Sequence, residues 1–195
     1  TATVLVGGTV LVTAGQGLGN VLLNSAELYD PATNTWSVEQ PLTIARTAHT
    51  ASMLFDGQVL VAGGGIPGNI ATSSAELYDP ITHTWSPAAS MAEARSHHTA
   101  SVLSNGKVLV TPGYISNAVF GTKAEMYDPA NDTWSDAGTL ATARVWATAG
   151  VLSNGKVLVA GGFNVGHPPN TELYDPATNT WGLAGKLVTP RRDHT

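Results

Sequence analysis

The sequence predicts an all-β protein built from four copies of one repeat. The first observation is a ten-residue motif, ELYDPATNTW at 27–36, which recurs in related form at 76–85, 125–134 and 172–181. The glutamates that open these motifs are 49, 49 and 47 residues apart, and a near-constant period of this length is typical of repeat architectures. The second observation is the density of Pro and Gly, which leaves no uninterrupted ten-residue pattern for a helix.

The composition excludes several classes of protein. Apolar residues make up 43% of the 195 residues and charged residues only 12%, which argues against disorder. The formal net charge is −5 and the basic residues are scattered singly, so we expect no nucleic-acid partner. No apolar run approaches the ~18 residues of a membrane span. The chain has no cysteine, which excludes disulfides, thiolate metal sites and cysteine nucleophiles.

Each repeat begins with two predicted strands joined by a tight turn. In the first repeat these are residues 2–6 and 9–14, and in the later repeats Asp-Gly or Asn-Gly joins the pair. Both residues tolerate the positive φ of a type I′ turn, so these dipeptides predict short hairpins. The second strand contains Val-Leu-Val in every repeat, which predicts a strand buried on both faces. The four copies occupy 10–12, 59–61, 108–110 and 157–159.

A variable segment, a third strand and a fourth strand complete the repeat. The third strand contains Glu-Leu-Tyr or Glu-Met-Tyr, Asp-Pro opens the next turn, and Trp begins the fourth strand. Four antiparallel strands in about 49 residues predict one blade of a β-propeller. We therefore expect a single propeller domain over 1–195, with four four-stranded blades. Their expected bounds are about 1–49, 50–98, 99–147 and 148–195.

The repeated residues resemble those of the kelch family, the type found in the propeller of galactose-oxidase-like proteins. The resemblance rests on the glycine pairs Gly63-Gly64 and Gly161-Gly162 and on a Tyr and a Trp in every repeat, and it covers the whole chain. Two repeats depart from the pattern, with Ala14-Gly15 and Pro112-Gly113 in place of the double glycine. The resemblance implies a radial propeller in which strand one lines the central channel and strand four lies outside.

Most repeated side chains have a structural interpretation. The tyrosines and tryptophans are expected to fill the space between blades. An arginine recurs just before the first strand of the next repeat, as Arg46, Arg95, Arg144 and Arg191. These four arginines match the four repeated glutamates in number. Either each blade has an Arg–carboxylate pair, or the arginines ring the channel mouth and meet an acidic partner. The histidines of one column, His49, His98 and His194, are expected to bond backbone or water, and we expect no metal and no cofactor.

The expected binding face lies on the side of the variable segments 16–24, 65–73, 114–122 and 163–170. Strands alternate in direction, so the loops after strands two and four share one side, and variation on a uniform frame is typical of recognition. Trp146 stands out because we align it with Ala48, His97 and Arg192 in the other repeats. The predicted ligand contacts are Arg46, Arg95, Arg144, Tyr114, Phe120 and Trp146.

No catalytic motif is visible, and the copper radical oxidases with related propellers need a cysteine that this chain lacks. We therefore expect a non-catalytic binding or scaffolding module for a protein, peptide or glycan. The alternatives are the non-catalytic propeller part of a larger secreted enzyme and a recently amplified or engineered repeat protein without an evolved ligand. The scarcity of Lys beside abundant Thr, Asn and Gly favours an extracellular or periplasmic location.

Closure of the propeller has three possible forms. The end repeats are as apolar as the inner ones, so their outer faces need a partner. A closed monomeric ring of four blades is favoured, while a two-chain ring of eight blades and a longer propeller with further blades stay open.

Overall fold

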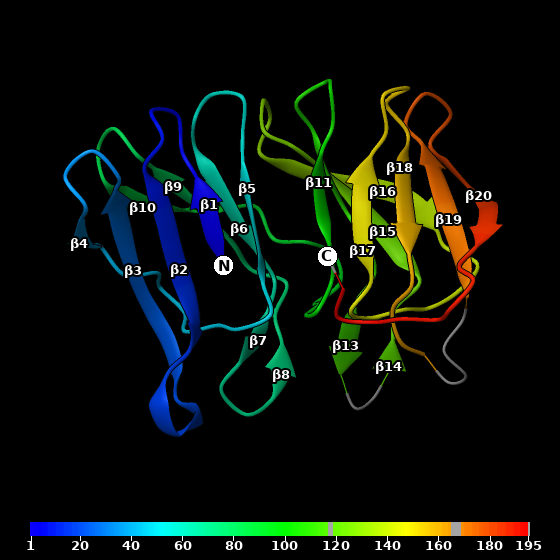
Figure 1. Ribbon diagram of the computed structural model, residues 1–195, viewed down its shortest axis with the longest axis horizontal. Coiled ribbons are helices and arrows are strands. Elements are labelled where there is room, and N and C mark those ends of the chain that lie inside the picture. Colours follow the sequence, from blue (N-terminus) through cyan, green and yellow to red (C-terminus); the bar gives the residue numbers. More distant parts are fainter. Residues whose placement is uncertain (117–118, 165–168, 195) are drawn as a thin grey trace. The chain divides into compact units, whose positions relative to one another are not determined.

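The computed structural model describes residues 1–116, 119–164 and 169–194. In this part of the chain the structure is all-β, and the one helical segment is a 3-10 turn, η1 (Leu18–Asn20). Four four-stranded antiparallel sheets are present among the described residues, each made from one repeat (Figure 1). The predicted all-β class and the four-strand composition of the repeat are therefore confirmed. No helix in the described residues is long and apolar enough to cross a membrane.

The chain divides into two compact units, Thr1–Ser96 and His97–Thr195, and each contains two of these sheets. The first sheet of the first unit contains β1 (Ala2–Val4), β2 (Val10–Gln16), β3 (Leu22–Asp30) and β4 (Thr35–Glu39). These strands lie side by side in the order in which they occur in the sequence. The second sheet contains β5 (Thr50–Met53), β6 (Val59–Ala62), β9 (Ala75–Asp79) and β10 (Thr84–Ala88). A short hairpin, β7 (Gly65–Ile66) with β8 (Ile70–Ala71), lies in the variable segment between β6 and β9.

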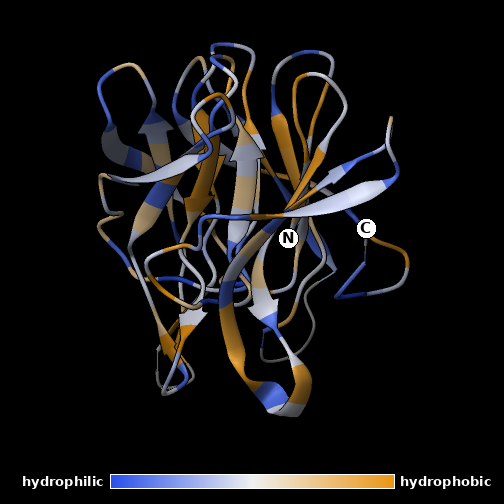
Figure 2. Cartoon of the chain, turned by 90° about the vertical axis from the view of Figure 1, so that its left-hand side faces the viewer, coloured by the Kyte–Doolittle hydropathy of each residue, from blue (hydrophilic) through white to orange (hydrophobic). Residues whose placement is uncertain are grey.

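The second unit repeats this plan. Its first sheet contains β11 (Ala100–Val102), β12 (Val108–Val110), β15 (Lys123–Asp128) and β16 (Thr133–Thr139). Its second sheet contains β17 (Thr148–Val151), β18 (Val157–Ala160), β19 (Asn170–Asp175) and β20 (Thr180–Lys186). The variable segment of the third repeat again forms a hairpin, β13 (Tyr114–Ser116) with β14 (Val119–Phe120). In the first unit the hydrophobic colour continues into the projecting end of the β2–β3 hairpin (Figure 2).

The tight turns between the first two strands differ from the predicted type I′ geometry. That type needs positive φ at both central residues. Only the glycine of each later pair has it, with φ of 91° at Gly57 and 81° at both Gly106 and Gly155. The preceding Asn side chain instead accepts a hydrogen bond from the backbone two residues on, as in Asn105 Oδ1 to the Lys107 amide at 3.1 Å. The prediction of a hairpin is confirmed, and the prediction of its turn type is wrong.

Each unit has a hydrophobic core between its two sheets. In the first unit Leu11 and Leu42 of the first repeat pack with Val59, Val61 and Tyr78 of the second. All five side chains are at most 1% exposed. In the second unit the same positions meet, and they are Leu109, Leu140, Val157, Val159 and Tyr174. Burying side chains of this size contributes about 1.5–3 kcal/mol each, so these contacts stabilise the pairing of consecutive sheets.

The Val-Leu-Val strands show which sheet faces are covered. All three residues are buried in β6 and β12, as predicted. In β2 only the central Leu11 is buried, while in β18 the central Leu158 is half-exposed and its two neighbours are buried. The prediction of burial on both faces therefore holds for the two inner repeats. In the first and last repeats, opposite faces of the strand are the more exposed ones.

Candidate binding site

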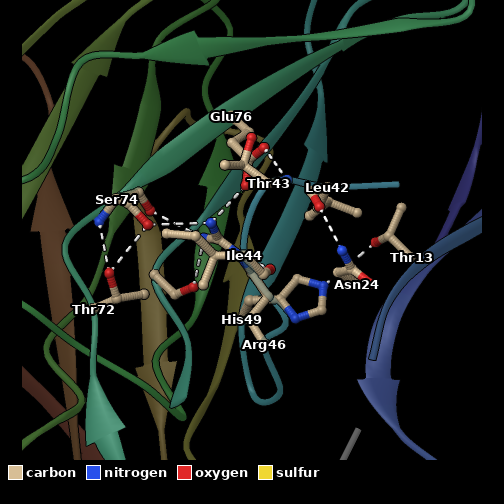
Figure 3. Close-up of polar contacts among 11 residues, drawn as sticks. Thr13, Asn24, Leu42, Thr43, Ile44, Arg46, His49, Thr72, Ser74 and Glu76 are labelled. Carbon is tan, nitrogen blue, oxygen red and sulfur yellow. Dashed lines mark hydrogen bonds and ion pairs between the residues drawn. The ribbon is translucent and has the colours of Figure 1, made fainter. Parts of the chain in front are cut away.

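Two of the repeated arginines, Arg46 and Arg144, form buried ion pairs with glutamates of the next repeat. Figure 3 shows the contacts around Arg46. Arg46 is 0% exposed, and its Nη2 lies 2.8 Å from Glu76 Oε1. Its other terminal nitrogen, Nη1, donates to the carbonyl oxygens of Gly63 at 2.9 Å and Ser74 at 3.1 Å. The second carboxylate oxygen of Glu76 accepts the Thr43 amide at 2.8 Å. The network satisfies both charged groups, as buried ions require.

Arg144 has the same set of partners in the second unit. Its Nη2 lies 2.8 Å from Glu172 Oε1, and its Nη1 donates to the carbonyl oxygens of Gly161 at 3.0 Å and Asn170 at 2.9 Å. Arg95 is likewise buried, at 1% exposure. This burial argues against the predicted ligand contacts at Arg46, Arg95 and Arg144, because no guanidinium surface is left for a ligand. The structural alternative, an Arg–carboxylate pair, applies to Arg46 and Arg144.

A left-handed residue recurs two positions after each arginine. Ala48, His97, Trp146 and Asp193 all have φ between 52° and 55°. The shared conformation shows that the column aligned with Trp146 contains Asp193, so the alignment with Arg192 was wrong by one residue. In the second unit the backbone links three of these residues, since the Asp193 amide donates to the Trp146 carbonyl at 3.2 Å and the Trp146 amide to the His97 carbonyl at 3.2 Å. Positive φ is unfavourable for bulky side chains and is found disproportionately at functional sites.

Trp146 belongs to a cluster of rings that joins four segments of the second unit. Its ring lies 5.2 Å from His97 and 5.7 Å from Phe163, measured between centroids. Phe163 lies 5.9 Å from Phe120, and Phe120 lies 6.1 Å from Tyr114. These separations are typical of attractive edge-to-face and tilted ring pairs. We call these five residues the aromatic cluster. All five residues are half-buried, so each retains some exposed surface.

A guanidinium group covers part of this cluster. Arg192 Cζ lies 5.2 Å from the Trp146 ring centroid and 5.0 Å from that of Phe163, which is cation–π geometry. The Arg192 side chain is exposed, and its Nε lies 3.7 Å from Asp193 Oδ2. Burial lowers the pKa of His97, and the nearby Asp193 carboxylate partly offsets this effect. The cluster therefore presents apolar ring surface beside one accessible cation.

Three of the predicted contacts, Tyr114, Phe120 and Trp146, meet in this cluster. The prediction omitted His97, Phe163 and Arg192. A signal for Phe163 was present, because it directly follows a double glycine as Tyr114 follows Pro112-Gly113. In the structure Phe163 forms a β-bridge with Val145, the residue directly before the left-handed Trp146. Parts of segments 114–122 and 163–170 lie outside the described residues.

The first unit has a groove on the side of its variable segments. It has a volume of about 600 Å³ and lies between segment 16–24 and segment 65–73. Asn20, Leu22, Thr47 and Ile66 are among the residues that line it. The link that ends the first repeat borders this side, because the Arg46 amide donates to the Leu23 carbonyl at 3.1 Å. The loops after the second and fourth strands thus share one side of this unit, as the alternation of strand direction predicts.

In the histidine column, His49 contacts threonine hydroxyl groups. His49 is 5% exposed, and its Nε2 lies 2.9 Å from Thr1 Oγ1. In residues 1–116, 119–164 and 169–194, no three His, Asp or Glu side chains are grouped closely enough to hold a metal ion.

The sheets and the aromatic pairs between their third and fourth strands define a propeller-like repeat protein. In every repeat the Tyr and Trp rings pack at 5.0–5.1 Å between centroids. The sequence profile of the Kelch motif matches residues 1–43, 46–92 and 95–141, which is more than half of the chain. The chain therefore belongs to the kelch repeat family. Kelch repeats generally form protein-binding propeller modules, and the family is generally non-catalytic.

Solved structures share this fold. Of these, 191 chains match, and one titled "Structure of YjhT" aligns with a TM-score of 0.82 at 16% sequence identity. The alignment covers 98% of this chain and 71% of that chain. At this identity the likeness shows the fold alone. No curated protein sequence matches the chain.

Proposed function

We propose that this chain is a non-catalytic binding module and that the aromatic cluster is its ligand site. The single observation that supports this proposal is the row of half-buried rings from Tyr114 to His97 with the exposed Arg192 over two of them. Core aromatics of the repeat, such as Tyr127 and Tyr174, are at most 2% exposed, whereas the cluster residues are only half-buried.

The ligand that fits this chemistry is a peptide segment with an apolar or aromatic anchor next to an acidic residue. Exposed aromatic and arginine side chains dominate the energetics of protein interfaces. The rings supply apolar area, and Arg192 supplies N–H donors for a carboxylate. In this proposal Tyr114, Phe120 and Trp146 remain contacts from the predicted set, and Phe163 and Arg192 join them.

We also infer that the four sheets are blades of one propeller domain over 1–195. The proposal is supported by the kelch profile and by the repeated contact between consecutive sheets in each unit. A glycan is the alternative ligand for the aromatic cluster, since a sugar face stacks on an aromatic ring without needing the guanidinium group.

The test is a calorimetric titration with synthetic peptides that place Leu, Phe or Trp beside Asp or Glu. For a peptide that binds, Trp146→Ala is expected to cost about 2 kcal/mol or more, which is about thirtyfold in affinity. Arg192→Ala is expected to weaken acidic peptides and to leave their amide analogues unchanged. The control is Phe55→Ala, because Phe55 is exposed at a turn of the first unit, outside the cluster. Loss of binding with Phe55→Ala, but not with Trp146→Ala, would contradict the assignment.

A further inference from the structure

We propose that a groove at the turns of the sheet of β5, β6, β9 and β10 binds a peptide segment in which Lys or Arg stands beside an apolar residue. The groove has a volume of about 710 Å³ and lies in the first unit. It is formed by the β5–β6 turn and the β9–β10 turn, at the end of the sheet opposite the β7–β8 hairpin (Figure 1). We call it the turn groove, and its lining includes Phe55, Asp56, Gln58, Asp79 and Ile81. It is separate from the aromatic cluster, whose residues all belong to the second unit.

The third and fourth repeats have an ion pair at the place of this groove. In the third repeat Lys107 Nζ lies 3.0 Å from Asp128 Oδ2, and in the fourth Lys156 Nζ lies 2.9 Å from Asp175 Oδ2. Each lysine directly follows the Asn-Gly pair of the first turn, and each aspartate opens the Asp-Pro turn. The pair therefore joins the two turns of one sheet and supplies a counter-ion to the carboxylate.

The second repeat has Gln58 in place of this lysine. The strand register puts Gln58 opposite Asp79, since their neighbours Val59 and Tyr78 are paired. Within residues 1–116, 119–164 and 169–194, no lysine or arginine forms an ion pair with Asp79. This aspartate therefore lacks the counter-ion that its equivalents in the third and fourth repeats have.

The carboxylate of Asp79 is nevertheless fixed and charged. Its Oδ1 accepts the Ile81 amide at 2.8 Å, as Asp128 Oδ1 accepts the Ala130 amide at 3.0 Å. The hydrogen bond from Ile81 is the main cause that lowers the pKa of Asp79, and His83 has a smaller effect. Asp79 is therefore ionised at neutral pH and keeps the local contact of the aspartate that receives a lysine in the third repeat.

Three more positions of the turn groove differ from the third and fourth repeats. Phe55 replaces a serine and is 71% exposed, and Ile81 replaces an alanine and is 86% exposed. Asp56 replaces an asparagine but makes the same turn contact, with its Oδ1 accepting the Gln58 amide at 3.0 Å. The residues replaced are Ser104 and Ser153, Ala130 and Ala177, and Asn105 and Asn154. The turns form without these changes, and each change adds apolar area or negative charge to one groove.

The net charge of the chain is concentrated in the first unit. Residues 1–96 contain seven of the 14 acidic side chains and two of the nine basic ones, so this unit carries the whole formal charge of −5. Both basic residues, Arg46 and Arg95, are at most 1% exposed. The first unit therefore has no accessible lysine or arginine of its own for the turn groove, and its field attracts a cationic partner.

A basic residue beside an apolar one matches both properties of the groove. The ammonium or guanidinium group takes the role that Lys107 has in the third repeat and pairs with Asp79, while Asp56 adds negative charge. The apolar neighbour packs on Phe55 and Ile81, which removes apolar area from water. A peptide offers both groups on adjacent residues, whereas a polyamine offers no apolar side chain.

The test is a calorimetric titration with synthetic peptides that place Lys or Arg beside Leu, Phe or Trp. Each has an analogue in which Gln replaces the basic residue, and the analogues are expected to bind at least about tenfold more weakly. Gln58→Lys is expected to weaken the basic peptides by a similar factor, because the new lysine pairs with Asp79 as its equivalent does in the third repeat. Ile81→Ala is expected to weaken them about fivefold through lost apolar contact.

Two control variants separate charge from size and from folding. Gln58→Met has about the length of lysine without its charge, so it is expected to retain binding. Val38→Ala removes an exposed apolar side chain of β4 outside the groove and is expected to bind like the unchanged chain. Gln58→Lys and Ile81→Ala introduce residues that the third and fourth repeats already have there, so the thermal unfolding of both variants is expected to stay close to that of the unchanged chain.

Equal losses with Gln58→Lys and Gln58→Met would show that charge is not recognised and would overturn the proposal. Basic peptides that do not bind at about 1 mM, or that bind both Gln58→Lys and Ile81→Ala without loss, would overturn it as well. Phe55→Ala is expected to weaken the basic peptides and to leave the acidic peptides of the aromatic cluster unaffected, so the two sites are tested independently.

Discussion

Arg46 and Glu76 lie 30 residues apart in consecutive repeats, and their charged groups meet at 2.8 Å with the arginine fully buried. The pair is surrounded by backbone partners, since the guanidinium also binds two carbonyl oxygens and the carboxylate also binds an amide. The first repeat is thereby fixed to the second through a guanidinium group that is fully buried and a carboxylate that is nearly so.

Arg46→Ala is expected to destabilise the fold by about 3–5 kcal/mol, because it leaves a buried carboxylate without its counter-ion. Chemical denaturation monitored by tryptophan fluorescence measures the change. Lys107→Ala is the control, since the Lys107–Asp128 pair is partly exposed and such pairs contribute at most about 1 kcal/mol. Equal effects of the two substitutions would contradict the structural role of the buried pair.

Gly64→Ala is expected to be more damaging than Gly15→Ala, although the two glycines occupy the same position of the repeat and have φ of 108° and 111°. A Cβ at Gly64 would lie 2.7 Å from the Thr47 carbonyl oxygen and 2.9 Å from His49 Cβ. A Cβ at Gly15 meets nothing within 4 Å.

Because both substitutions carry the same backbone strain, the difference between them isolates the steric clash. We expect about 1–3 kcal/mol, measured as the difference in free energy of unfolding. Equal losses would mean that the left-handed backbone alone requires glycine here.

His49 is expected to make stability fall at acidic pH. Burial, followed by the N-terminal ammonium group and Arg46, lowers the pKa of His49 to about 3, against 6.5 in the unfolded chain. The folded state therefore binds fewer protons than the unfolded state between these values. The contribution of His49 is fully present above pH 6.5 and is lost as the pH falls toward 3, at up to about 1.4 kcal/mol per pH unit.

His49→Ala tests this effect, since alanine occupies the same column naturally at Ala147. The variant is expected to show a shallower loss of unfolding free energy between pH 6.5 and pH 4 than the unchanged chain. Parallel pH profiles for the two proteins would show that His49 is not the titrating group.

The Asp128 carboxyl is expected to titrate at higher pH in Lys107→Ala. The hydrogen bond from Lys107 is the main cause that lowers the pKa of Asp128, and Nζ lies 3.0 Å from Oδ2. Carbon-detected NMR titration measures the change. Asp30 is the internal control, because its pKa is lowered chiefly by the Ala32 amide and its repeat has no equivalent lysine. An unchanged Asp128 titration would exclude the lysine as the cause.

The repeat and its strands were predictable because each rests on local chemistry that recurs four times. Asp-Pro turns, the Tyr–Trp pair and the Val-Leu-Val strands all occur where the sequence predicts them. The turn type was less accessible, because Asn105 satisfies a backbone amide with its side chain instead of adopting positive φ.

The site was only partly predictable. An arginine on the side of the variable segments suggests contact with a ligand. The carboxylate that pairs with Arg46 instead belongs to Glu76 of the next repeat. Spacing in the sequence does not distinguish a partner within the chain from a bound ligand. Trp146 was recognised because it breaks a repeated column, and Tyr114 and Phe120 because they are apolar residues of a variable segment. The link through Phe163 and the position of Arg192 over the rings depend on which residue of the column has the left-handed backbone. That residue is Asp193 in the last repeat, and aligning Arg192 with Trp146 instead concealed the arrangement.

The link between repeats is held by the main chain on both sides. The Arg46 carbonyl accepts the Gly15 amide of its own repeat at 2.8 Å, and Thr47 exchanges two backbone hydrogen bonds with Gly65 of the next repeat, at 2.7 and 2.9 Å. Val145 and Phe163 exchange the equivalent two bonds in the second unit. Main-chain bonds of this kind require no particular side chain, so the residue at this junction position can differ between repeats, as Thr47 and Val145 do.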